Sequence, residues 1–325
     1  MSVHRRELLR LAAGGAVLPF LWQCAGTRTY SKRRTRILVG FPAGGPVDIA
    51  ARLIAPWLSD QFGQPFVIEN LVGESGNLAT KAVVNARPDG STLLLCGPVN
   101  TINTTLFKNL GFDFSRDIVP VASLFSVPLV VEVNPSFPAQ NVSEFLALAK
   151  SQPGRIRVGY AGRGTPQHIG IELFKMIAGV DLTLVPYLGS PPALAALLSG
   201  EVDAMFDPLP SSIGHIRGGR LRPLAVTSPT RSEALTNVPP MSDFVPGYEA
   251  GSWFGIGAPK NTPGNIIRRL NKAVKAGLGD PKIKARIAEL GGTATAQSPS
   301  DFAAFIAKET KRFALVIRTA GITAG

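Results

Sequence analysis

Apolar residues along the chain form short continuous runs, separated by longer stretches in which they recur at helical spacing. Most runs do not alternate with polar residues, which is typical of parallel strands covered by helices on both faces. The intervening stretches predict helices of about ten to sixteen residues. The sequence therefore predicts an α/β fold. The predicted strands are 36–40, 66–69, 92–96, 156–160, 182–186, 202–206 and 221–227.

Hydroxyl–proline pairs indicate where four of the helices begin. The hydroxyl accepts a free N–H of the first turn, and proline fits the first helical position without losing a hydrogen bond. Glycine is the usual residue just after a helix. The predicted N-cap pairs are Thr165-Pro166, Ser190-Pro191, Thr262-Pro263 and Ser298-Pro299, and the predicted stops are Gly179, Gly200, Gly277 and Gly291.

Two strand-like runs, 127–134 and 252–258, flank a middle block of the chain. If both run between lobes, the chain leaves one lobe, builds a second and returns. This predicts a discontinuous lobe of residues 36–134 plus 252–325 and a continuous lobe of residues 135–251. A double crossing of this kind suits a hinge with a ligand cleft between the lobes.

The N-terminus resembles a targeting segment. An arginine pair, Arg5-Arg6, precedes an apolar stretch, 11–22, that is too short to span a bilayer. We predict a signal peptide over residues 1–30, with the cleavage site between residues 25 and 30. The run around the arginine pair has the twin-arginine arrangement, and an ordinary secretory signal is the alternative. Either signal predicts an exported, soluble, periplasmic protein.

The net charge of +12 is concentrated in this segment, because residues 1–36 hold eight basic residues against one acidic residue. The remainder has no long basic run, so nucleic-acid binding is not expected.

Metal and cofactor sites are also not expected. Only two histidines, His168 and His215, follow the leader, and no phosphate-binding loop is present. The run 73–77 nearly matches a G-x-S-x-G nucleophile motif but ends in Asn77.

Glycine-rich turns between strand and helix are the strongest candidates for a binding site. The first turn, 41–48, has paired glycines that let a ligand approach the backbone, and it opens a helix whose N–H groups suit an anion. The second turn, 160–168, has the same design and should face the first across the cleft. Turns at 70–77 and 187–190 are further examples. For the first turn alone, a tight connection that binds no ligand is the alternative.

These turns, in this order, resemble the Bug-type receptors, which are the substrate-binding proteins of tripartite tricarboxylate transporters. The resemblance covers nearly the whole chain after the leader. It rests on the segments 41–48, 67–70, 87–94, 112–122, 185–193, 200–206, 219–227 and 258–263.

The resemblance implies a two-lobed type II periplasmic-binding fold. It also implies a receptor, not an enzyme, that captures a small organic carboxylate without a cofactor, as a monomer, for membrane components of such a transporter. Asp207 could meet the ammonium of an amino-acid ligand, although a turn residue before Pro208 is the alternative. The implied ligand-binding residues are Phe41, Pro42, Ala43, Gly44, Gly45, Asp48, Asn70, Ser75, Gly76, Gly162, Arg163, Gly164, Thr165, His168 and Asp207.

Two residues depart from the family pattern. Glu74 places a negative charge near the expected carboxylate cradle. Arg163 stands where the family often has a small residue, and it either holds a second carboxylate bidentately or is exposed to solvent. These departures favour a dicarboxylate, or an acid with another polar group. The alternative functions are a ligand sensor for a membrane kinase and a hydrolase that uses Ser75.

Overall fold

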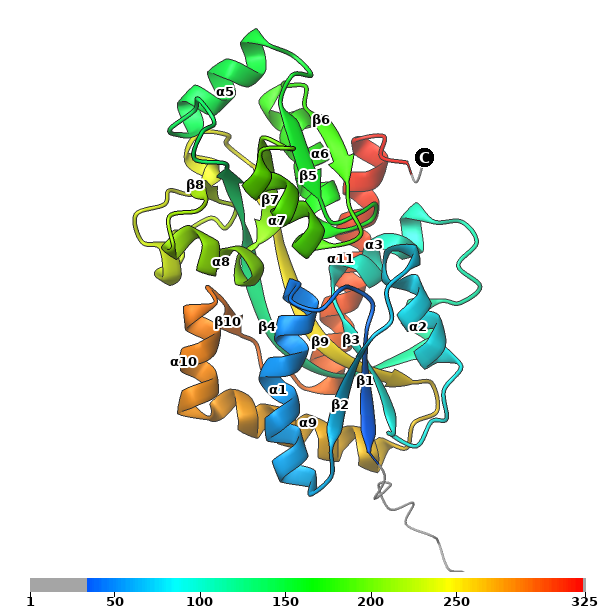
Figure 1. Ribbon diagram of the computed structural model, residues 1–325. Coiled ribbons are helices and arrows are strands. Elements are labelled where there is room, and N and C mark those ends of the chain that lie inside the picture. Colours follow the sequence, from blue (N-terminus) through cyan, green and yellow to red (C-terminus); the bar gives the residue numbers. More distant parts are fainter. Residues whose placement is uncertain (1–33, 324–325) are drawn as a thin grey trace, which may run out of the picture.

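The computed structural model describes residues 34–323, which form two α/β lobes joined by long strands (Figure 1). The predicted two-lobed α/β fold is confirmed. Its strands are β1 (Thr35–Val39), β2 (Phe66–Asn70), β3 (Thr92–Cys96), β4 (Ile118–Val133), β5 (Arg157–Tyr160), β6 (Thr183–Pro186), β7 (Ala204–Pro208), β8 (Arg222–Val226), β9 (Gly251–Pro259) and β10 (Thr293–Ala294). Its helices are α1 (Pro46–Phe62), α2 (Asn77–Val84), α3 (Pro98–Leu106), α4 (Phe114–Asp117), α5 (Val142–Ser151), α6 (Pro166–Ala178), α7 (Ser190–Ser199), α8 (Leu209–Arg217), α9 (Gly264–Gly279), α10 (Pro281–Glu289) and α11 (Pro299–Thr319), with short 3-10 turns at Glu74–Gly76, Glu233–Leu235 and Met241–Asp243.

Lobe 1 contains the parallel strands β2, β1 and β3, continued by antiparallel β9 and β4. One face of its sheet packs against α1 and α9 through residues such as Ile54 and Leu270. The other face packs against α2 and α11 through residues such as Val83 and Phe302. The sheet is therefore covered on both sides, as the unbroken apolar runs predicted.

Lobe 2 repeats this plan with parallel β7, β5 and β6, joined to β4 and β8. Its larger core includes Phe145 of α5 and Phe174 of α6, and its smaller core includes Leu197 of α7. The carboxyl ends of β5 and β7 point toward lobe 1, because the helices that follow them, α6 and α8, begin at the boundary between the lobes (Figure 1).

The strand β4 links the two sheets. Residues 118–128 pair with β9 in lobe 1, and residues 129–133 pair with β7 and β8 in lobe 2. The sequence predicted only 127–134 as extended, because Pro120 and Ser123 interrupt the apolar pattern upstream. Both residues lie where the pairing register with β9 shifts, and strands tolerate proline at such irregularities. The assignment of residues 36–134 plus 252–325 and 135–251 to the two lobes stays a prediction.

Two of the four predicted caps are correct. Thr165 and Ser298 accept the N–H groups of His168 and Asp301, respectively. The other two predictions are wrong, because α7 is capped by Gly189 and α9 by Pro263. The hydroxyls that were expected to cap these helices donate hydrogen bonds elsewhere, Ser190 to Asp207 and Thr262 to the Pro259 carbonyl.

Gly179 and Gly200 end their helices as predicted, in the left-handed conformation. Gly277 does not, because α9 continues to Gly279. Gly291 lies one residue beyond Leu290, which caps α10.

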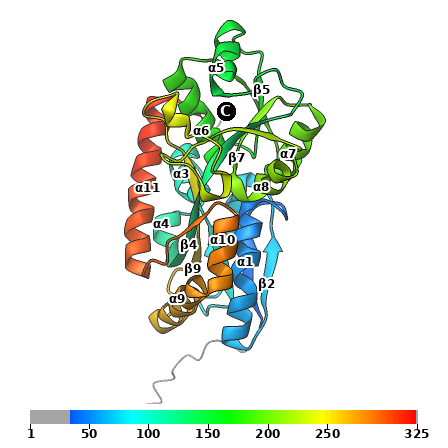
Figure 2. The ribbon, with the colours of Figure 1, turned by 90° about the vertical axis from the view of Figure 1, so that its left-hand side faces the viewer.

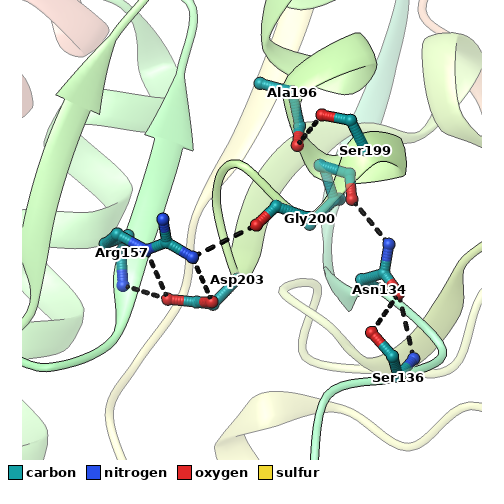
Figure 3. A network of polar contacts seen from close by, with 8 residues as sticks. Asn134, Ser136, Arg157, Ala196, Ser199, Gly200 and Asp203 are labelled. Carbon is teal, nitrogen blue, oxygen red and sulfur yellow. Dashed lines mark hydrogen bonds and ion pairs between the residues drawn. The ribbon is translucent and has the colours of Figure 1, made fainter.

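A polar network lies at the amino-terminal ends of β5 and β7, opposite the ends that point toward lobe 1. Figure 3 shows its contacts. The Asp203 carboxylate accepts from the Arg157 backbone N–H at 2.8 Å and from the Arg157 guanidinium at 2.9 and 3.1 Å. The same guanidinium donates to the Gly200 carbonyl at 3.1 Å, and Asn134 donates to the Leu197 carbonyl at 2.9 Å. This network ties the start of β5 to the end of α7 and to the segment before β7.

Helix α11 runs along one side of both lobes (Figure 2). Its Phe313 and Ile317 pack with Ile102 and Leu106 of α3 and with Ile169 of α6. Apolar contacts away from the cleft therefore also join the lobes. Within residues 34–323, no helix combines the length and apolarity needed to cross a bilayer. The predicted signal peptide lies outside the described residues.

Candidate functional site

A hollow of about 430 Å³, open solvent at its mouth included, lies between the lobes at the carboxyl ends of the strands. Most side chains on its wall are apolar. Its lining comes from turns and strands of both lobes: Phe41, Gly45, Pro46, Val47, Gly97, Pro98, Val99, Ala161, Thr165, Pro166, Gln167, Ser190, Pro208, Ser252 and Phe254. We call this hollow the cleft.

Helix starts converge on the cleft. Within the described chain, α1, α3, α6, α7 and α8 all begin at its wall, and each has a proline at its first or second position. Proline removes one N–H from the first turn, and the remaining unpaired N–H groups give each helix start a partial positive charge. A wall built in this way combines apolar surface with a positive potential, which suits an anion that carries a carbon chain.

The first-turn N–H groups that remain come from particular residues. In α1, the Ile49 N–H donates to the Gly45 carbonyl at 2.9 Å, which leaves the N–H groups of Val47 and Asp48. In α6, the His168 N–H donates to the Thr165 hydroxyl at 3.4 Å, which leaves the N–H of Gln167. Donors from opposite lobes are therefore available to one ligand.

A buried carboxylate shapes the first turn. Asp48 is 1% exposed and accepts from the Gly44 N–H at 2.9 Å, from Asn70 at 3.0 Å and from Arg52 at 2.7 Å. Asn70 also donates to the Phe41 carbonyl at 2.9 Å. Burial alone would raise the pKa of Asp48, but these three hydrogen bonds together lower it. Asp48 and Asn70 therefore fix the turn and do not line the cleft.

The rest of the first turn divides into lining and exposed residues. Phe41 and Gly45 line the cleft, whereas Ala43 and Gly44 are exposed. Pro42 lies at the lobe boundary, since a Cβ added to Gly189 would come within 2.6 Å of its Cδ.

A neutral histidine supports the second turn. His168 is 7% exposed, accepts from the Gly164 N–H at 3.3 Å and stacks on Tyr160 with ring centroids 5.2 Å apart. Burial, together with the charges of Arg163 and Lys175, lowers the pKa of His168 to about 4. It is therefore uncharged at neutral pH and acts behind the turn.

Thr165 lines the cleft, but its hydroxyl donates to the Gly162 carbonyl at 2.6 Å. Its role in the turn is therefore structural as well. Arg163 is exposed and does not line the cleft. Of the two alternatives for this residue, holding a second carboxylate or exposure to solvent, the structure favours exposure.

The third turn lies beside the cleft mouth. Gly73–Gly76 and Gly162 line a second hollow beside the cleft, and both hollows are lined by Phe41 and Ala161. Glu74 is exposed, and both Glu74 and Ser75 have positive φ, at 48° and 52°. Glu74 lines this second hollow and not the cleft, so its side chain lies next to the cleft rather than on its wall.

Asp207 is fully buried and bonded to protein side chains. It accepts from Ser190 at 2.5 Å, from Gln167 at 3.0 Å, from Ser212 at 3.2 Å and from Ser211. Its carboxylate therefore lies behind the cleft wall, not on it. Both oxygens already have protein donors, which favours the structural alternative for Asp207, and a direct contact with a ligand ammonium stays a prediction.

Several lining residues were not singled out from the sequence as site residues. Gly97, Pro98 and Val99 form the turn between β3 and α3. The strand–Gly–Pro–helix pattern that marks 41–48 is also present at 96–99, and that signal could have identified them. Ser252 and Phe254 of β9 had no such signal, because strand residues show their cleft face only once the lobes are placed.

The two lobes touch around the cleft. A Cβ added to Gly164 would overlap the Asn103 side chain of lobe 1, and a Cβ added to Gly45 would lie 3.4 Å from Pro191 of lobe 2. Glycines at these points let the lobes approach closely, so the described state is a closed one.

Comparisons with known proteins agree on one family. The sequence profile described as "Tripartite tricarboxylate transporter family receptor" matches residues 50–322. The chain is 35% identical over 297 residues to protein BugT of Bordetella pertussis (strain Tohama I), covering 90% of this chain and 91% of BugT.

Solved structures extend the likeness to the fold. The structure of R. palustris Rpa4515 with adipate superposes with a TM-score of 0.87 at 38% identity, covering 90% of this chain and 98% of that one. The periplasmic binding protein BugD superposes with a TM-score of 0.87 at 31% identity, covering 90% of this chain and 99% of that one. The predicted periplasmic-binding fold is confirmed, and the chain belongs to the tripartite tricarboxylate transporter receptor family.

Proposed function

We propose that this protein is a periplasmic receptor that captures a small organic acid in the cleft and delivers it, chemically unchanged, to membrane components of a tripartite tricarboxylate-type transporter. One observation carries the proposal: helix starts from both lobes converge on an apolar hollow. The adipate bound to Rpa4515 is a dicarboxylate with an apolar middle, and this chemistry matches the wall.

Contact with both lobes is what couples binding to closure. A ligand shifts an open–closed equilibrium only by its difference in affinity for the two states. An acid that bridges the Val47 and Gln167 N–H groups has both partners only in the closed state. We propose that 36–134 plus 252–325 and 135–251 move as the two lobes, with β4 and β9 as the hinge.

Two other functions are less well supported. A sensor for a membrane kinase would use the same cleft, and its partner, not its ligand, would distinguish it. A hydrolase would need a base next to Ser75. Among residues 34–323, no histidine or carboxylate forms a hydrogen bond with the Ser75 hydroxyl, and the Ser75 backbone carbonyl accepts from Asn103.

Calorimetry and thermal unfolding against a panel of mono- and dicarboxylic acids test the proposal. A true ligand at 100 times its Kd should stabilise the protein by about 2.7 kcal/mol. Incubation followed by mass spectrometry should recover the acid unchanged, and light scattering should give a monomer. Absence of any stabilising acid would refute carboxylate capture, and conversion of the acid that stops in Ser75→Ala would favour the hydrolase.

A further inference from the structure

The net positive charge of residues 34–323 comes from the three C-terminal helices. Residues 34–323 include 28 basic and 21 acidic side chains, an excess of seven. Residues 264–319, which contain α9, α10 and α11, include 11 basic and four acidic side chains, which is the same excess. The rest of the described chain therefore has as many acidic as basic side chains. Attraction to an anionic partner should begin at these helices.

Helix α9 carries its charge on a single face. Its four charged residues are all basic and all exposed, and at 3.6 residues per turn they lie within about 120° of arc. The opposite face, which includes Leu270 and Val274, packs into the core of lobe 1. We call the four residues the basic face: Arg268, Arg269, Lys272 and Lys275. The other exposed residues of α9 are small and uncharged: Gly264, Asn265, Ala276 and Gly279.

Nearby acidic residues do not neutralise this face. Among residues 34–323, none of Arg268, Lys272 and Lys275 forms an ion pair. Asp280 is the next acidic residue along the chain, and it accepts from two backbone N–H groups at the start of α10, at 2.9 and 3.1 Å. The positive potential of the basic face therefore extends into solvent.

The chemistry of the basic face favours a broad anionic surface over a protein or a small ligand. None of its residues lines the cleft or the hollow beside it, and no aromatic or large aliphatic side chain of α9 is exposed. Protein interfaces usually have an apolar or aromatic centre with few lysines. A membrane surface with anionic headgroups needs only positive charge within a Debye length, which is about 8 Å at physiological salt.

The basic face lies far from the cleft. Helix α1 begins at the cleft wall and extends about 25 Å over its 17 residues. Trp57, in the second half of α1, donates to the Ala273 carbonyl of α9 at 2.8 Å, and the Arg269 guanidinium lies 4.8 Å from the ring of Phe62, the last residue of α1. Helix α9 is thus at the end of lobe 1 that is farther from lobe 2 (Figures 1 and 2). A surface that contacts the basic face leaves the cleft unobstructed.

We propose that the basic face of α9 binds the anionic phospholipid surface of the membrane that holds the transporter, and so keeps the receptor beside that membrane. The apolar face of α9 is buried in the core, so the contact involves charge without insertion and is reversible and sensitive to salt. This inference goes beyond the proposed function, because it concerns a surface other than the cleft and does not depend on which acid binds.

Sedimentation with lipid vesicles tests the proposal. The protein is purified after export, and mass spectrometry confirms that the predicted signal peptide, with its own arginines, has been removed. Vesicles of phosphatidylcholine with about 30% phosphatidylglycerol are compared with phosphatidylcholine alone. At about 0.1 M salt the protein should bind the anionic vesicles at least about tenfold more tightly, and the difference should disappear near 1 M salt, where the Debye length falls to about 3 Å.

A triple variant assigns the binding to α9. Each basic residue near an anionic membrane surface strengthens binding about fivefold, so Arg268→Gln, Lys272→Gln and Lys275→Gln together should weaken binding to the anionic vesicles at least about tenfold. The charge-conserving set Arg268→Lys, Lys272→Arg and Lys275→Arg should bind as the parent does.

A second triple variant controls for net charge. Lys81→Gln, Lys108→Gln and Lys150→Gln remove the same charge from exposed residues on other elements, and most of the affinity for anionic vesicles should remain. Thermal unfolding checks that each variant folds. If the α9 glutamine variant does not fold, the comparison of anionic with neutral vesicles decides alone.

The outcomes separate this inference from the proposed function. Equal binding of the parent to anionic and neutral vesicles overturns the inference, as does an equal loss of binding in the two glutamine variants. If the protein binds beads coated with polyglutamate but neither kind of vesicle, the partner is an acidic protein and the inference fails. Acid capture is measured separately by calorimetry, and the Kd for the acid should be the same in parent and variants, so either claim can fail while the other stands.

Discussion

Closure of the lobes can be tested at one glycine. Gly164 has φ +73°, and a Cβ added there would overlap Asn103 Oδ1 of the opposite lobe and lie 3.2 Å from Leu106 Cδ2. In Gly164→Ala the backbone strain is present in the open and closed states alike, at about 1 kcal/mol. The overlap, by contrast, exists only in the closed state. The variant should therefore weaken ligand binding more than it weakens the fold.

The structure sets the size of this effect. Asn103 can move aside only by giving up hydrogen bonds to the Ser75 carbonyl at 3.1 Å and to Asn77 at 3.0 Å. Loss of two such bonds costs about 1–3 kcal/mol, which corresponds to a rise in Kd of roughly 5- to 150-fold.

Gly179 offers a matched control for this variant. It has φ +63° in the same lobe, with no atom within 4 Å of an added Cβ. Gly179→Ala should therefore carry the same backbone strain and leave Kd unchanged. Calorimetry with the tightest acid of the panel gives both Kd values, and urea unfolding gives both stabilities. Equal Kd values for the two variants would refute the reasoning that the lobes must meet at Gly164 for the ligand to bind.

Three further predictions concern other parts of the molecule. Gly45→Leu should abolish acid binding with the fold retained, because Gly45 lines the cleft and has an extended conformation at φ −77°. Gly44→Ala should only lower stability, because an added Cβ at Gly44 would face open space. Calorimetry on both variants checks this contrast. Asp48→Asn should lower the free energy of unfolding at pH 7 by roughly 2 kcal/mol. Because folding lowers the pKa of Asp48, this difference in stability between variant and parent should shrink as the pH falls below about 4. Urea unfolding across pH measures the difference, and a difference that grew in acid would contradict the prediction. Asp203→Ala should lower the free energy of unfolding by about 1 kcal/mol and leave the Kd for the acid unchanged, because its network lies at the end of lobe 2 that is remote from the cleft. A changed Kd would contradict this and show that this end of the lobe is coupled to the cleft.

The sequence predicted the strands well, because unbroken apolar runs mark sheets that are covered on both faces. The predicted strand at 92–96 coincides with β3, and that at 252–258 lies within β9. The long β4 was predicted only in part, because Pro120 interrupts the sequence pattern and becomes acceptable only when a register shift accommodates it.

Local chemistry was less decisive for caps and charged groups. Ser190-Pro191 has the pattern of a cap, yet the Ser190 hydroxyl bonds Asp207, which a distant strand brings next to it. The same contact explains why Asp207 does not reach the cleft. Sequence spacing could place these residues near a turn but could not show which of them the fold buries, because burial depends on how α7 and α8 pack against the sheet of lobe 2.

The glycine-rich turns identified the region of the cleft, since Phe41, Gly45 and Thr165 line it. Asp48, Asn70 and His168 belong to the same turns but hold them from behind. A turn motif therefore mixes residues that could touch a ligand with residues that fix the backbone, and only the hydrogen-bond partners separate the two groups.

A crystal structure with the tightest acid of the panel tests the central claim most directly. The account predicts that the acid accepts hydrogen bonds from the helix starts of both lobes, at the Val47 N–H of lobe 1 and the Gln167 N–H of lobe 2. An acid found on one lobe alone, or outside the hollow between Phe41 and Gln167, would contradict it.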